Sequence, residues 1–194
     1  MIAPERTLII IKHDAVARGL VGKVIDRFEK VGLKLVDCKM AQPSEQMART
    51  HYDNGPEWVT MLGQKTLETF KEFGLDAKES LGTDDAAKLG QDVFDQLVKY
   101  LSSGPVVVMV WEGVGAIAVA RKLVGKTTPA MADVGTLRGD FTHDSQMIAP
   151  FKGRALQNLL HASGNKAEAD REITLWFGAD FRPEQYERVD AVFF

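Results

Sequence analysis

The chain has 194 residues, of which 45% are hydrophobic and 26% charged, a size that fits one globular domain over residues 1–194 with room for insertions. Its formal net charge of −3 argues against a general nucleic-acid binder, because nonspecific binding to the phosphate backbone comes from clustered Lys and Arg. The apolar runs are far shorter than the ~20 residues that a membrane-spanning helix needs, and no secretory signal is recognisable, so we expect a cytoplasmic protein with no membrane partner.

The first part of the chain is predicted to form a strand, a helix and a second strand. Leu8–Ile11 is a continuous apolar run typical of a strand buried on both faces, and it ends at Lys12. Apolar residues then recur at three- and four-residue spacing over residues 20–31, which predicts an amphipathic helix that ends at Gly32. Leu33–Met40 alternates imperfectly, but its length and position fit a second strand.

The middle of the chain is predicted to contain a helical insertion. Residues 45–90 are polar and interrupted by glycines, with short helical stretches such as Trp58–Phe73, and we place the insertion at about 53–90. After Gly90 the pattern predicts a helix through residues 93–101 and the most apolar strand of the chain, Pro105–Trp111. Another amphipathic helix is predicted over Ala116–Val124.

The last part of the chain begins with a long irregular segment. Residues 125–144 show no periodicity, and such a segment in a compact domain is usually functional or disordered. A short strand is predicted at Gln157–Leu160 and a last helix around residues 169–177. This order of elements predicts an α+β fold of the ferredoxin-like (split βαβ) type, a sandwich with an antiparallel sheet, helices on its faces and an inserted helical segment.

Two short motifs point to other classes of nucleotide-binding protein, but neither has the required context. Gly113–Ala118 resembles a dinucleotide-binding fingerprint after a strand, yet no second parallel strand with an acidic residue comes after it. Ala120–Thr127 resembles a relaxed P-loop, yet a helix precedes it and Pro129 interrupts the helix that should come after it. The net positive charge of residues 121–161 still suits a small anionic ligand, although ordinary solvated surface charge explains it equally well.

Four ordered blocks that span most of the chain resemble the nucleoside diphosphate kinase family. They are Glu5–Asp14 with Arg18–Gly22, then Gly104–Gly113, then Thr127–Pro129 with Gly135–Phe141, and finally Asn158–Ser163 with Glu172–Phe177. The resemblance implies a ferredoxin-like phosphotransferase that moves the γ-phosphate of ATP or another NTP onto an enzyme histidine and then onto an NDP. The alternative is a catalytically weak regulatory, nucleotide-binding or nucleic-acid-binding relative of the same fold.

By position in the matching blocks, the resemblance makes His161 the phosphorylated histidine. A neutral imidazole suits this role, since its pKa of about 6.5 leaves a free lone pair at pH 7. Glu172 would hold the other ring nitrogen, with Ser163 in support. Without the surrounding blocks, a histidine before two small residues would be read as a structural residue at a strand end.

The resemblance also assigns ligands for the nucleotide. The phosphate ligands map to Lys12, Arg121, Thr127 and Arg138, the sugar contact maps to Asn158, and Tyr52 lies beside the phosphate and the histidine. Taken alone, the cations could be surface charges and the polar residues turn residues. Mg²⁺ would arrive bound to the nucleotide phosphates, so we expect no metal ligands from the protein. A homo-oligomer, hexamer or tetramer, is implied by the resemblance alone.

Some positions depart from the family pattern. His13 and Ala15 replace the usual proline and glycine, Gly164 replaces an acidic residue, and a second insertion is expected at about 145–156. The aromatic residue that stacks on the base falls near Val93, and Phe94 is expected in the core. We therefore hypothesise that Trp58 or Phe70 of the insertion contacts the base. The base preference stays open.

The remaining histidines and the cysteine offer no metal site by their spacing. His51 is expected on the face of a helix and His143 in a loop, and neither has a partner at the spacing that metal binding requires. The single cysteine, Cys38, excludes an internal disulfide and a Cys-rich zinc site.

Overall fold

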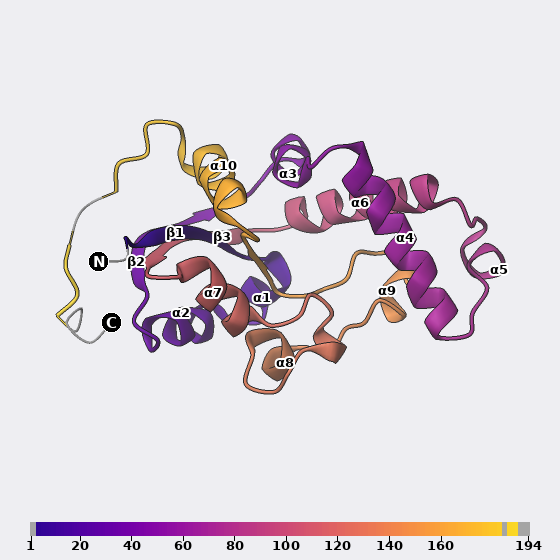
Figure 1. The fold of residues 1–194 in the computed structure, drawn as a ribbon, viewed down its shortest axis with the longest axis horizontal. Coiled ribbons are helices and arrows are strands. Elements are labelled where there is room, and N and C mark those ends of the chain that lie inside the picture. Colours follow the sequence, from indigo (N-terminus) through magenta and orange to yellow (C-terminus); the bar gives the residue numbers. More distant parts are fainter. Residues whose placement is uncertain (1–2, 184–185, 190–194) are drawn as a thin grey trace.

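The computed structural model describes residues 3–183 and 186–189. Its centre is an antiparallel sheet with the strand order β2-β3-β1-β4. The strands are β1 (Glu5–Ile11), β2 (Lys34–Ala41), β3 (Val106–Gly113) and β4 (Leu160–Ala162). This arrangement, with helices on both faces, confirms the predicted α+β ferredoxin-like class (Figure 1).

The helices form three groups around the sheet (Figure 1). One face is covered by α1 (His13–Ala17), α2 (Val21–Glu29), α7 (Ala116–Val124) and α8 (Leu137–Phe141). The other face is covered by α3 (Glu45–Tyr52), α6 (Ala86–Ser102) and α10 (Lys166–Phe177). At one end of the molecule lie α4 (Pro56–Glu72), α5 (Ala77–Leu81) and α9 (Ile148–Phe151). In addition, residues Pro129–Met131 form a 3₁₀ turn between α7 and α8.

The alternation of β1 divides the core into two layers. Ile9 and Ile11 face the side of α2 and α7, whereas Leu8 and Ile10 face the side of α3, α6 and α10, and all four are fully buried. Successive side chains of a strand point to opposite faces, so a run without polar residues fits a strand covered on both sides. The prediction for Leu8–Ile11 is confirmed.

The imperfect alternation of the second strand has a structural cause in β2. Leu35 pairs with Trp111, and Asp37 pairs with Val110, the neighbour of Trp111 in β3. Val36 has no partner residue in β3 between these two pairs and is therefore the extra residue of a β-bulge. A bulge shifts the side-chain pattern by one position. The strand is therefore where the sequence places it, and only its alternation is interrupted.

The contact between α4 and α6 explains why the helix break predicted at Gly90 is wrong. Gly90 lies inside α6, which begins at Ala86. The Asp85 side chain caps this helix by accepting hydrogen bonds from the backbone N–H groups of Ala87 and Lys88. A Cβ on Gly90 would overlap the carbonyl oxygen of Val59 in α4, and one on Gly63 would overlap that of Ala86. The missing side chains let the two helices touch. The helical stretch within residues 58–73 is confirmed as part of α4.

Near the C-terminal end, the predicted strand Gln157–Leu160 is shifted along the chain. The observed strand β4 begins at Leu160, because Leu159 has a left-handed backbone with φ of 66° that interrupts the extended conformation. His161 consequently lies inside the strand, opposite Ile10. The last helix is confirmed as α10, whereas residues 125–144 contain a 3₁₀ turn and the short α8.

Among the described residues, no helix has both the length and the apolar character needed to cross a membrane.

Candidate active site

A cavity of about 340 Å³ opens where β1 and β4 end beside α3, α4 and α7. It brings together all but one of the predicted site residues, namely Lys12, Tyr52, Arg121, Thr127, Arg138, Asn158, His161 and Glu172. The exception is Ser163, which lies behind Glu172. A larger cavity of about 620 Å³ between the ends of β2 and β3 and residues 186–188 contains none of them. We therefore take the smaller cavity, called the phosphate pocket below, as the candidate active site.

His161 is held by Glu172 from the next helix. Its Nε2 lies 2.9 and 3.0 Å from the two carboxylate oxygens of Glu172, and the Ser163 hydroxyl donates to the same carboxylate at 2.7 Å. Burial alone would raise the pKa of Glu172, but His161, Ser163 and Arg171 together lower it below its ordinary value. Glu172 is thus an anion that fixes the tautomer of His161 with the proton on Nε2 and the lone pair on Nδ1.

The backbone that carries His161 is fixed from two sides. Lys12 N donates to the Leu159 carbonyl oxygen at 2.8 Å, and Ser163 N donates to that of Leu8 at 3.2 Å. Leu159, whose carbonyl oxygen accepts the first of these bonds, has a left-handed φ. A non-glycine residue in this region is uncommon and persists only where its surroundings hold it. The position of His161 is thus set by β1 and by the strained residue two positions before it.

Lys12 places a buried ammonium group beside this strand. It is 4% exposed, its Nζ donates to Asn158 Oδ1 at 2.8 Å, and it lies 4.7 Å from the ring centroid of Tyr100. Burial first, and then the Arg138 charge, lower the pKa of Lys12 to about 7, although Asp14 opposes the shift. An anionic ligand in the phosphate pocket would therefore favour the charged form of Lys12.

Arg138 joins the irregular segment to the strand that carries His161. Its guanidinium donates to three carbonyl oxygens, those of Asn158 at 3.0 Å, Gly125 at 2.9 Å and Leu160 at 2.6 Å. Burial lowers the pKa of Arg138 to about 10, so it remains a cation at neutral pH. Part of its donor capacity is thus structural, and its remaining N–H groups are available at the pocket wall.

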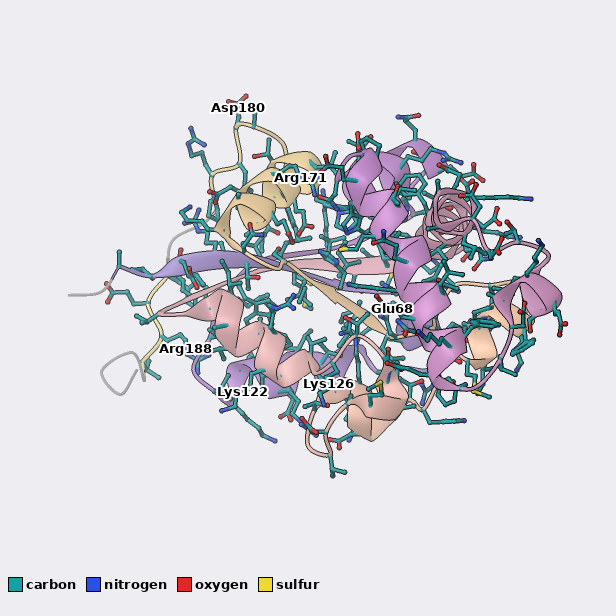
Figure 2. The ribbon with its side chains drawn as sticks, turned by 45° about the vertical axis from the view of Figure 1, so that its right-hand side comes forward. Glu68, Lys122, Lys126, Arg171, Asp180 and Arg188 are labelled. Atoms are coloured by element: carbon teal, nitrogen blue, oxygen red, sulfur yellow. The ribbon has the colours of Figure 1, made fainter. Side chains whose placement is uncertain are left out.

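The rim of the phosphate pocket carries further donors. Arg121 on α7 and Thr127 in the following loop are exposed, as predicted ligands of a soluble nucleotide should be. The Asn158 side chain donates to the Thr127 carbonyl oxygen at 3.1 Å, which ties this loop to the residues before β4. Lys126, at the end of α7 in Figure 2, also lines the pocket and was not predicted.

Tyr52 contributes a hydroxyl group to the pocket wall. Its oxygen is buried and makes no hydrogen bond within the described part of the chain. Burial, together with the Glu172 charge, raises the pKa of Tyr52, so the hydroxyl keeps its proton. A buried hydroxyl without a partner costs free energy unless a ligand supplies one. Its position at the pocket wall fits a donor to a bound phosphate oxygen.

His51 is a further residue of the site that sequence reasoning missed. It is 1% exposed, its ring lies 4.4 Å edge-on from that of His161, and its Nδ1 accepts from Trp176 Nε1 at 3.3 Å. Burial and the neighbouring His161 hold the pKa of His51 well below its ordinary value. Arg171, labelled on α10 in Figure 2, donates to the His51 carbonyl oxygen at 3.3 Å. The signal was present in α3, because residues 48, 51 and 52 share one helix face and all are buried.

One group of possible metal ligands occurs among the described residues. His51, His161 and Glu172 offer ligand atoms within 4.8 Å of one another, although the spacing in sequence showed no such partner for His51. The shortest distance in this group is the hydrogen bond between His161 and Glu172. Mg²⁺ prefers oxygen ligands, and the only carboxylate of the group is already engaged.

The two hypothesised base contacts differ in the structure. Trp58 lines the phosphate pocket and packs edge-on against Phe94 at 6.5 Å. Phe70 is 1% exposed, and its ring centroid lies 5.7 Å from that of Phe151. It does not line the phosphate pocket. The hypothesis for Phe70 is wrong, because its ring fills the core of the α4 region. The prediction that Phe94 packs against the core is confirmed.

Comparisons with known proteins show which family this chain belongs to. The family model described as nucleoside diphosphate kinase matches residues 5–58 and 78–181. A nucleoside diphosphate kinase of Pyrobaculum aerophilum is 49% identical over 173 residues, which cover 89% of this chain and 94% of that protein. A crystal structure of an NDP kinase from the same organism superposes with a TM-score of 0.86 at 47% identity, covering 90% of this chain and 96% of the other.

A second solved structure shows the chemistry of a relative. It is a transition-state mimic of nucleoside-diphosphate kinase from Borrelia burgdorferi with bound vanadate and ADP. It superposes with a TM-score of 0.76 at 37% identity and covers 96% of this chain and 94% of that one.

Proposed function

We propose, from the premise that this chain belongs to the nucleoside diphosphate kinase family, that His161 is the residue that carries the phosphoryl group. The chain acts as a nucleoside-diphosphate kinase, which transfers the γ-phosphate of ATP or another NTP to an NDP by a ping-pong mechanism with a phosphohistidine intermediate. The observation that carries the proposal for His161 is the bond from its Nε2 to Glu172, which leaves the lone pair of Nδ1 for phosphorus.

The reaction needs no base at the nucleophile. Nδ1 of neutral His161 attacks the γ-phosphorus, the bond to the oxygen that bridges the β- and γ-phosphates breaks, and the NDP leaves with that oxygen. The imidazole gains positive charge as the P–N bond forms, and the Glu172 carboxylate stabilises this charge through Nε2–H. Ser163 keeps the carboxylate in place. A second NDP then takes the phosphoryl group by the reverse of these steps.

Fixed positive charge and hydroxyl donors would hold the phosphates. Phosphoryl transfer depends mainly on positioning and on stabilising the charge of the oxygens around phosphorus. Lys12, Arg121 and Arg138 supply charge at the pocket wall, while Thr127 and the unpartnered Tyr52 hydroxyl supply neutral donors. Asn158, which binds Lys12 and the Thr127 loop, would contact the sugar.

The residues of the phosphate pocket fit Mg²⁺ that is bound by the nucleotide. Two carboxylates line the pocket within the described residues, and both are engaged, Glu172 with His161 and Ser163, and Glu168 with Gly164 N and Asn165. The protein therefore offers cations and hydroxyls toward the phosphates, and Mg²⁺ would be held by the phosphates themselves. When bound, it would neutralise charge on the β- and γ-phosphate oxygens.

Phosphorylation of the purified protein tests the assignment of His161. With γ-labelled ATP and Mg²⁺, we expect acid-labile label on the wild type, no label on His161→Ala, and transfer of the label to GDP in a chase. His51→Ala is the control for loss of a neighbouring ring, and it should still accept label. Label on a well-folded His161→Ala variant would overturn the assignment. A folded wild type that binds nucleotide without accepting label would instead indicate a binding relative.

We further propose that residues 1–194 form one domain with inserted segments at about 53–90 and 145–156. The gap at residues 59–77 between the matched parts of the family model supports the first insertion. A homo-oligomer, hexamer or tetramer, rests on the family resemblance, and light scattering of a stable 21 kDa particle would overturn it. A cytoplasmic location is supported by the exposed free thiol of Cys38, since such thiols are typical of reducing compartments, and cell fractionation tests it.

A further inference from the structure

Two neighbouring residues of α3 present buried polar atoms that have no hydrogen-bond partner within the described residues. Five such atoms occur in this part of the chain, and two of them belong to residues that line the phosphate pocket, Nε2 of His51 and the hydroxyl oxygen of Tyr52. Native proteins leave few buried polar groups unpaired, so each one calls for an explanation. The proposed function gives the Tyr52 hydroxyl a role toward phosphate, but it uses no atom of His51.

The contact with Trp176 determines the tautomer of His51. Nε1 of Trp176 is an N–H group that can only donate, and it lies 3.3 Å from Nδ1 of His51, which therefore accepts. Burial, then His161 and the charges of Lys12 and Arg171, hold the pKa of His51 well below its ordinary value, so the ring is neutral. A neutral imidazole that accepts at Nδ1 carries its proton on Nε2. The unpaired group of His51 is thus an N–H donor.

The rings of His51 and His161 approach the same carboxylate. Oε1 of Glu172 lies 2.9 Å from Nε2 of His161 and 4.0 Å from Nδ1 of His51. The two ring centroids are 4.4 Å apart, and the ring planes are 80° to each other. The nitrogens that remain for a ligand are Nδ1 of His161 and Nε2 of His51, and both residues line the phosphate pocket. A phosphoryl group on Nδ1 of His161 would therefore lie beside the free N–H of His51.

The ring of His51 is fixed before any ligand binds. It is 1% exposed, and its centroid lies 4.9 Å from that of Tyr52 and 5.9 Å from that of Trp176. Arg171 donates to the backbone carbonyl oxygen of His51 and so connects α10 to α3, which lies on the same side of the sheet (Figure 1). A donor that is already in place needs no reorganisation when charge develops beside it.

We propose that Nε2–H of His51 donates a hydrogen bond to an oxygen of the phosphoryl group carried by His161, which makes His51 a further catalytic residue. This inference rests on the proposed role of His161 and adds a neutral donor to it. The phosphoryl oxygens are negatively charged, and a hydrogen bond to a charged acceptor is stronger than one between neutral groups. Because the N–H has no partner in the free enzyme, the bond would stabilise the phosphoenzyme relative to the free enzyme.

A crystal structure of the phosphorylated wild type tests the contact directly. We expect Nε2 of His51 to lie within about 3.2 Å of a phosphoryl oxygen, which is hydrogen-bond distance. A phosphoryl group on His161 with no oxygen in reach of Nε2 would overturn the inference and leave the proposed function intact. Failure of the wild type to form a phosphoenzyme would instead overturn the proposed function, and the inference with it.

The equilibrium between free enzyme and phosphoenzyme tests the energetic role of the donor. At fixed ratios of labelled ATP to ADP, His51→Phe should still accept label, but its equilibrium constant for phosphorylation should be lower by about ten- to hundredfold, the value of a hydrogen bond to a charged group. His51→Gln keeps one donor and one acceptor and should recover part of this loss. Trp176→Phe removes the N–H that determines the tautomer, and its loss should be smaller than that of His51→Phe.

His143→Phe is the matched control, because this exposed histidine lies outside the phosphate pocket. It should leave the equilibrium constant unchanged. An unchanged constant in a folded His51→Phe variant, or equal losses in His51→Phe and His51→Gln, would overturn the inference, since a packing role does not depend on a donor. If His51→Phe does not fold, the crystal structure of the phosphorylated wild type still decides.

Discussion

Both carboxylate oxygens of Glu172 lie within 3.0 Å of Nε2 of His161. The same carboxylate accepts from Ser163, so it has a fixed orientation and a lowered pKa. In the mechanism that we propose, this contact leaves His161 one defined free nitrogen, Nδ1, as the nucleophile. It would also place a negative charge beside the ring that becomes positive during phosphorylation.

Replacing Glu172 by Gln is expected to slow phosphoryl transfer with little effect on folding. The amide keeps the shape of the carboxylate but lacks its negative charge. In the proposed mechanism, that charge stabilises the developing imidazolium. We expect the rate of phosphoenzyme formation to fall by about 10²-fold, the size of other losses of transition-state stabilisation. Rapid-quench measurement of labelled enzyme checks this.

The matched control for Glu172 is Asp170→Asn, which removes a charge from an exposed position of the same helix. Within the described part of the chain, the Asp170 carboxylate pairs only with Lys166. It should leave the rate unchanged. Equal rates in Glu172→Gln and the wild type would refute an electrostatic role for the carboxylate.

Nucleotide affinity should depend on the charge of Lys12. Because the pKa of Lys12 is lowered to about 7 by burial, a growing fraction of the free enzyme is neutral as the pH rises above 7. Phosphate binds the charged form, so binding must restore the proton and the affinity for ADP should fall from pH 7 to pH 9. Calorimetry at pH 8 in buffers of different ionisation enthalpy should detect the uptake of nearly one proton.

Lys12→Met removes this group and provides the control for the pH dependence. The variant should bind ADP more weakly, and its proton uptake at pH 8 should be absent. Uptake that persists in the variant would assign the effect to another group. An affinity of the wild type that stays constant between pH 7 and pH 9 would show that Lys12 is already fully charged in the free enzyme.

Tyr52→Phe should reduce activity without reducing stability. The Tyr52 hydroxyl has no partner in the described structure, so its removal deletes an unsatisfied buried group. We expect an unfolding free energy that is unchanged or higher by up to about 1 kcal/mol, and a kcat/KM about tenfold lower if the hydroxyl donates to phosphate. Urea denaturation and steady-state kinetics measure the two effects.

Tyr100→Phe gives the opposite pattern and is the comparison for Tyr52. The Tyr100 hydroxyl accepts from Asn158 N at 3.2 Å, so its loss leaves a buried N–H without a partner and should destabilise the fold by about 1–3 kcal/mol. A loss of stability in Tyr52→Phe as large as that in Tyr100→Phe would contradict the idea that the Tyr52 hydroxyl is kept for a ligand.

The sequence predicted the elements whose patterns are local. The strand at Leu8–Ile11 was placed correctly because a strand buried on both faces has a continuous apolar run. The helix at Ala116–Val124 was placed correctly because a helix buried on one face has apolar residues at three- and four-residue spacing. Most of the predicted site residues lie in the four motif blocks, and each block relates its residues to one strand or loop, whereas Tyr52 and Arg121 lie outside the blocks. His161 could thus be predicted without knowing the contact with Glu172.

Features that depend on tertiary contacts could not be predicted in this way. The strand β4 was placed too early because the φ of Leu159 has no signal in a leucine. Phe70 was offered, with Trp58, as a hypothetical base contact because its packing against Phe151, which joins segments far apart in the chain, cannot be read from the sequence. Gly90 was read as a helix end because the close approach of α4 is invisible in one sequence.

The two glycines at the contact of α4 and α6 give the last prediction. Gly90→Ala should destabilise the fold, because its Cβ would overlap the carbonyl oxygen of Val59 and backbone cannot move aside as a side chain can. We expect a loss of about 1–3 kcal/mol in the free energy of unfolding, typical of overpacking, measured by urea denaturation. Gly22→Ala, in α2 with nothing within 4 Å of the added carbon, should instead stabilise by about 0.5–1 kcal/mol. The same sign for both substitutions would show that the helices do not approach as closely as the structure has them. Opposite signs would confirm that α4, which lines the phosphate pocket through Trp58 and Leu62, is held against α6 through these glycines.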